Sequence, residues 1–255
     1  MVGRGVPMIG HDVQARSGAR DRSVHWRGHA FLFERKDAPG YEATTGLRLL
    51  VLFVALEGGR ALPLYSWLRL PLPPIWVRVP VMLGLALLMA RFVAGVSLPQ
   101  IGVRPWREWS GTEKSYAVQI VLIGNIVFLA LFADRLRTIL AGPHALGRVT
   151  TVFIPYFLYG FYQEVMYRGI LQTELVRRWG AACGILVSNA LYTFGPLHSG
   201  YFSRGAPAAL ALFAGVFAIG LIFAVLFRRS GNLLIVAVMH AIGNSYIVGS
   251  LGPVS

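Results

Sequence analysis

The stretch Tyr159-Gly-Phe-Tyr-Gln-Glu-Val-Met-Tyr-Arg-Gly169 places a carboxylate, Glu164, and a guanidinium, Arg168, at the end of the apolar run 149–162. Ionisable side chains at membrane depth are costly and rare, so each one is by default a functional-site hypothesis. Two later apolar segments carry three further polar side chains: His198, His240 and Asn244. Together these groups predict a buried polar site that several helices share.

The composition is typical of a membrane protein. Of the 255 residues, 55% are hydrophobic and 14% are charged, whereas a soluble domain has about 25% charged residues. About 20 apolar residues are enough to cross the hydrocarbon core. Windows that approach this length lie near 44–63, 75–95, 115–133, 149–173, 181–197, 207–227 and 231–249. The sequence therefore predicts an all-α, polytopic transmembrane helix bundle of about seven membrane helices, with eight as the alternative.

The formal net charge of +13 does not indicate nucleic-acid binding. The basic residues are scattered through the connections between apolar windows, which is the pattern of the positive-inside rule. With a cytoplasmic N-terminus, fourteen Lys and Arg lie on the cytoplasmic side and seven on the other side. We therefore predict an integral membrane protein that has the lipid bilayer as its partner, binds no nucleic acid and keeps its N-terminus in the cytoplasm.

The chain is expected to divide into two parts. Residues 1–43 are charged throughout, lack the apolar core of a cleavable signal and are expected to form a poorly ordered basic tail. Residues 44–255 are expected to form the membrane-embedded helical domain, with a motif-bearing core at about 98–249. The single cysteine, Cys183, excludes an intrachain disulfide and any cysteine-based metal cluster.

Helical spacing predicts that the polar groups meet. Trp179-Gly180 has the composition of a tight turn, and Glu164 lies fifteen residues before it while His198 lies eighteen residues after it. In an antiparallel hairpin, both would lie roughly 22–27 Å from the turn. Counted from Gly231, His240 and Asn244 lie roughly 14–20 Å from a turn on the same side of the bundle. Three helices thus present polar groups to one region of the bundle.

These residue types suit peptide hydrolysis without a covalent intermediate. Glu164 could take a proton from water that His198 helps to hold, while Arg168, one turn away, offsets the cost of burying the carboxylate. His240 and Asn244, which are also four residues apart, could donate hydrogen bonds to the developing oxyanion. One such donor typically contributes about 3–4 kcal/mol.

The same atoms leave a metal-dependent alternative open. Glu164, His198 and His240 could bind a divalent ion such as zinc with water in the fourth position, as in a metalloprotease. The helical zinc signature His-Glu-x-x-His is absent from the chain. We therefore favour a site without metal or other cofactor.

Three short motifs resemble those of a known protein family. They are Gln163-Glu164-Val-Met-Tyr-Arg168-Gly169, Phe194-Gly-Pro-Leu-His198 and His240-Ala-Ile-Gly-Asn244. In this order they are similar to the motifs of the CPBP family, the CAAX prenyl protease and bacteriocin-processing (Abi) intramembrane proteases. The resemblance implies a glutamate-dependent membrane endopeptidase of about residues 98–249. Its implied catalytic residues are Glu164, Arg168, His198, His240 and Asn244.

One position departs from the family pattern. The family begins its first motif with two glutamates, and the first of them, regarded as the base, is Gln163 here. Glutamine can orient water but cannot accept its proton at neutral pH. Either Glu164 takes this role, or the chain is a weak or inactive relative that binds peptides as an immunity or scaffold protein.

The resemblance also bears on partners and location. It implies a membrane-anchored protein or peptide substrate, and the compact chain resembles bacterial members, which places it in the bacterial inner membrane. A transporter that relays protons through buried Glu and His is a further alternative, although no internal repeat pairs the two halves of the chain.

Overall fold

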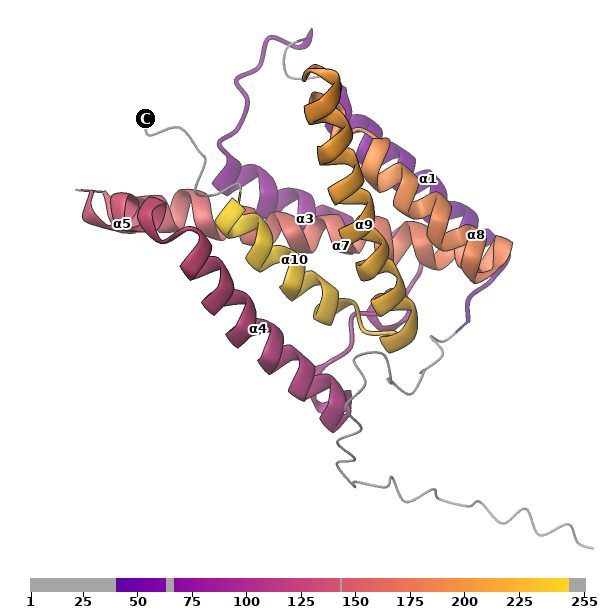
Figure 1. The fold of residues 1–255 in the computed structure, drawn as a ribbon. Coiled ribbons are helices and arrows are strands. Elements are labelled where there is room, and N and C mark those ends of the chain that lie inside the picture. The colour runs from indigo at the N-terminus through magenta and orange to yellow at the C-terminus, as the bar shows by residue number, and fades with distance from the viewer. Residues whose placement is uncertain (1–39, 63–66, 143, 248–255) are drawn as a thin grey trace, which may run out of the picture.

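The computed structural model describes residues 40–62, 67–142 and 144–247, and this part of the chain is helical (Figure 1). The predicted basic tail, 1–43, lies almost entirely outside the described residues. The main helices are α1 (Ala43–Ala61), α3 (Ile75–Phe92), α4 (Gly111–Leu131), α5 (Ala133–Ala141), α6 (Ala145–Arg148), α7 (Ile154–Glu164), α8 (Thr173–Phe194), α9 (Ala206–Ser230) and α10 (Leu233–Ile247). Two π-helical segments, η3 (Val149–Phe153) and η4 (Val165–Gln172), and the short 3₁₀ segments η1 (Leu98–Ile101), η2 (Trp106–Glu108) and η5 (Ser199–Tyr201) complete it.

The predicted all-α fold class is confirmed. Each of the seven apolar windows falls on a helix of the described chain, and three helices, α3, α4 and α9, are long and apolar enough to cross a membrane. Helix α10 is equally apolar but shorter. Helix α1 carries Arg48 and Glu57 within its apolar sequence, and this is the window for which the sequence signal was weakest.

The segment that carries the first motif is one continuous helical rod. Backbone angles stay helical from α6 through η3, α7 and η4 into α8, until Gly180 adopts φ 78° and ψ 170°. The chain turns back there, and the backbone of Gly184 lies directly against the backbone of Val176. The predicted turn at Trp179-Gly180 is therefore confirmed. The returning half of α8 ends at Phe194, two residues before Pro196.

Helix α7 lies at the centre of the bundle. It packs against α10 on one side and against α3 on the other (Figure 1). Gly160 allows the close approach to α10, because a Cβ atom at this position would lie 2.6 Å from Cα of Ala241. This contact sets the distance between the helices that carry Glu164 and His240.

Helix α1 is fixed to this rod by a buried carboxylate. Glu57 accepts hydrogen bonds from the hydroxyls of Tyr162 (2.7 Å) and Tyr167 (2.9 Å), and it pairs with Arg60 on its own helix (2.8 Å). Since all acceptor positions of a buried carboxylate need partners, this network holds α1 in one orientation against α7 and η4.

The close approach of α7 and α10 generates a testable expectation. Gly160→Ala should separate the two helices and destabilise the protein by about 1–3 kcal/mol, the usual cost of overpacking. The measurement is thermal unfolding of the purified protein in detergent. Gly215→Ala in α9 is the matched control, because a Cβ atom there meets nothing within 4 Å. Equal melting temperatures for the two variants would contradict the proposed contact.

Candidate active site

Glu164 is the centre of the polar cluster. It lies at the junction of α7 and η4 and is completely buried. Its Oε1 atom lies 2.6 Å from Nδ1 of His240 on α10, and its Oε2 atom lies 3.4 Å from Nε of Arg168 on η4. The Glu164–Arg168 pairing expected from the four-residue spacing is present, and a second helix completes the cluster.

The charge of Arg168 is accommodated by two neighbouring helices. Its Nη2 atom donates a 3.0 Å hydrogen bond to the carbonyl oxygen of Gly220 on α9, and its guanidinium lies 4.2 Å above the ring of Tyr192 on α8. A side chain at Gly220 would collide with Asn189 and lie 3.2 Å from Nη2 of Arg168. Glycine is therefore required for this approach.

His240 is oriented by its contact with Glu164. A carboxylate accepts, so Nδ1 of His240 donates its proton to Glu164, and the lone pair of the neutral ring is on Nε2. The hydroxyl of Tyr192 lies 3.4 Å from this Nε2 atom. The ring thus presents a proton-accepting nitrogen on the side away from Glu164.

Gln163 and Asn244 form a second polar contact between the same two helices. Nδ2 of Asn244 donates a 2.8 Å hydrogen bond to Oε1 of Gln163. This contact leaves the amide N–H groups of Gln163 and one N–H of Asn244 for other acceptors. His240 and Asn244, four residues apart on α10, therefore contact the consecutive residues Glu164 and Gln163 at the end of α7.

His198 lies beside this cluster rather than in direct contact with Glu164. It follows the end of α8, and its Nδ1 atom donates a 2.9 Å hydrogen bond to the carbonyl oxygen of Tyr192. The ring of Tyr192 contacts both imidazoles edge-on, with centroid distances of 5.0 Å to His198 and 6.0 Å to His240. The geometry pairs Glu164 with His240, whereas the sequence analysis grouped it with His198.

Two residues that hold the cluster or the helix that carries it were not identified from the sequence. Tyr192 belongs to none of the three motifs, and only its position six residues before His198 in the chain connects it to them. Glu57 lies in the first apolar window and belongs to none of the motifs. The rule that made Glu164 a candidate, an acid within an apolar helix, applies equally to Glu57.

The three candidate metal ligands do not converge on one point. Glu164 and His240 meet, but no hydrogen bond or ion pair connects either of them to His198. Within residues 40–62, 67–142 and 144–247, no three His, Cys, Asp or Glu side chains are placed to hold a metal ion. The arrangement does not fit a zinc ion held by these three residues.

Comparison with known proteins supports the interpretation of the motifs. Residues 145–246 match the family model described as type II CAAX prenyl endopeptidase Rce1-like. No curated protein and no solved structure matches the chain. The matched segment contains every residue of the Glu164–His240 and Gln163–Asn244 contacts, and apolar helices of membrane-spanning length flank or form it. The chain is therefore an integral membrane protein, and its residues 145–246 are similar to type II CAAX prenyl endopeptidases of the Rce1-like kind.

Proposed function

We propose that the protein is an intramembrane endopeptidase that hydrolyses a peptide bond of a membrane-associated protein or peptide. The observation that carries the proposal is the 2.6 Å contact between Oε1 of Glu164 and Nδ1 of His240 inside the bundle. A buried carboxylate that orients an imidazole is the arrangement by which hydrolases create a general base. The charge distribution favours a cytoplasmic N-terminus, and the resemblance to bacterial members favours a bacterial inner membrane.

In this mechanism His240 takes the proton from the attacking water. Its Nε2 atom carries the lone pair, and Glu164 stabilises the imidazolium that forms. Glu164 itself is enclosed, with one oxygen at His240 and the other facing Arg168, so the geometry favours a positioning role for it. The imidazolium then returns the proton to the leaving amine, which completes the hydrolysis.

The amide pair is placed to stabilise the oxyanion. The amide N–H groups of Gln163 and the remaining N–H of Asn244 are donors that gain strength where charge develops, and each such donor is worth about 3–4 kcal/mol. The sequence analysis gave this role to His240 and Asn244. In the present mechanism Gln163, the residue that departs from the family pattern, takes the place of His240 as an oxyanion donor. His198 lies on the other side of Tyr192 and is assigned to orienting the water.

A non-catalytic function is the second candidate, and Gln163 is the observation that favours it. The position at which the family has its leading glutamate here holds an amide that is already hydrogen-bonded to another amide. A protein of this kind would bind a peptide near Glu164 without cleaving it. Detecting binding but no cleavage of a set of single-pass membrane peptides would support this candidate over the peptidase.

Removing the carboxylate tests the proposed base. Glu164→Gln should lower the cleavage rate roughly 10²- to 10⁴-fold, the range for loss of general-base catalysis, because the imidazolium loses its anionic partner. Cleavage of single-pass membrane peptides by the purified protein in detergent is measured by mass spectrometry. Asp134→Asn, a change at an exposed acid of α5, is the control. Unchanged cleavage by Glu164→Gln would exclude the Glu164–His240 base.

A double-mutant cycle tests the amide pair. Gln163→Ala and Asn244→Ala should each lower kcat by about 10²- to 10³-fold with little change in KM, because the donors act in the transition state. The double variant should lose little more than either single variant, since each amide positions the other. The control is Gln119→Ala in α4, whose amide bonds only to Ser115. Additive losses would show that the two amides act independently.

A further inference from the structure

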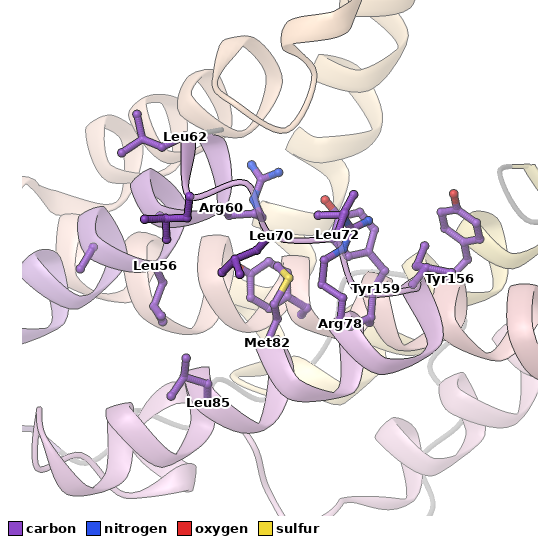
Figure 2. Close-up of a pocket in the computed structure, with 16 residues that line it drawn as sticks. Leu56, Arg60, Leu62, Leu70, Leu72, Arg78, Met82, Leu85, Tyr156 and Tyr159 are labelled. Atoms are coloured by element: carbon purple, nitrogen blue, oxygen red, sulfur yellow. The ribbon is translucent and has the colours of Figure 1, made fainter. Parts of the chain in front are cut away.

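A large cavity lies between α1, α3 and α7, on a different face of α7 from His240. Its volume is about 1040 Å³, and most of its lining is apolar, with Leu56, Met82 and Leu85 among the side chains (Figure 2). None of the candidate catalytic residues lines it. Pockets for drug-sized ligands are typically about 300–1,000 Å³, so this cavity can hold a large hydrocarbon group.

Two arginines give this apolar cavity a cationic region. Figure 2 shows Arg60 and Arg78 among the side chains that line the cavity, with Arg78 beside Tyr159. Arg60 is neutralised by Glu57. Arg78 forms no ion pair with any residue of 40–62, 67–142 or 144–247. Its guanidinium is therefore available to an anionic group from outside the described chain.

The aromatic residues around Arg78 indicate its depth in the bilayer. Trp67 is 63% exposed and Trp76 is 52% exposed, and Arg78 lies in the first turn of α3. Exposed tryptophan and arginine at a helix end are typical of the headgroup level of a membrane. The cationic part of the cavity thus lies where lipid phosphates lie, and Leu85, two turns further along α3, lies at the level of acyl chains.

We propose that this cavity is a binding site for an anionic phospholipid. The phosphate is held by Arg78, whose planar guanidinium can form two parallel hydrogen bonds with phosphate oxygens. One acyl chain lies between α1 and α3 against Leu56, Met82 and Leu85. A lipid without net charge fills the apolar part but leaves the cation at the mouth unbalanced, so the site prefers the anionic headgroup.

The site adjoins the catalytic helix without being part of the proposed reaction. Tyr162 lines the cavity, donates its hydroxyl proton to Glu57 and precedes Gln163 in the chain. A lipid in the cavity therefore packs against the same rod that carries Glu164. Lipid binding itself does not depend on peptidase activity and can be measured separately.

Native mass spectrometry of the full-length protein in detergent tests the headgroup preference. Phosphatidylglycerol and phosphatidylcholine with identical acyl chains are the probes. The unmodified protein should retain phosphatidylglycerol about fivefold better, the factor that corresponds to roughly 1 kcal/mol per basic residue at a membrane surface. Arg78→Gln should abolish this preference, whereas Arg91→Gln, at the other end of α3, should keep it. Equal retention of both lipids by the unmodified protein, or an unchanged preference in Arg78→Gln, would overturn the proposal.

A second pair of variants tests the acyl-chain position. Leu85→Trp should fill the cavity and lower retention of both lipids, while Leu88→Trp, an exposed position of α3 that does not line the cavity, should have no effect. Retention unaffected by Leu85→Trp would place the lipid elsewhere. Displacement of phosphatidylglycerol by the membrane peptides of the cleavage assay would show that the substrate occupies the cavity and would also overturn the proposal. The Arg78 comparison decides the matter alone if Leu85→Trp fails to fold.

Discussion

The structure depends on one fully buried carboxylate that lies between a guanidinium and an imidazole. Burying an isolated ion costs several kcal/mol, so Glu164 is tolerated only with both partners in place. Arg168 in turn needs the carbonyl of Gly220 and the ring of Tyr192. The charge of one residue on α7 therefore constrains α8, α9 and α10, and close packing at Gly160 follows from the same requirement.

The central rod of α7 and η4 has a buried acid on each of two sides, and the two acids are held in different ways. Glu164 belongs to the rod and is held by an arginine on it and a histidine from α10. Glu57 comes from α1 and is held by its own Arg60 and by two tyrosines of the rod. The first acid orients an imidazole whose Nε2 atom lies 3.4 Å from the hydroxyl of Tyr192, which suits proton transfer. The second acid is saturated by donors, which suits a structural role.

The sequence predicted the helices, the turn at Gly180 and the pairing of Glu164 with Arg168, because apolar run length, glycine and four-residue spacing are local properties. It did not predict which histidine contacts Glu164. His198 follows a helix end that Pro196 prevents from continuing, so its position depends on an irregular connection that has no period. The sequence did not identify Tyr192, because an aromatic residue in an apolar helix has the same sequence pattern in a functional site as in ordinary packing. The π-helical winding of η4 depends on hydrogen-bond register, which composition does not reveal.

That winding explains how one carboxylate can accept from two tyrosines five positions apart. In an α-helix, residues separated by five positions point about 140° apart, whereas these two hydroxyls bond to the two oxygens of the same carboxylate. The i→i+5 hydrogen bonding of a π-turn brings such residues onto nearly one face. The two hydrogen bonds that Glu57 accepts from the tyrosines therefore depend on the π-helical winding of η4. If η4 tightened to ordinary winding, one tyrosine would swing away and every residue beyond it, Arg168 included, would rotate relative to Glu164.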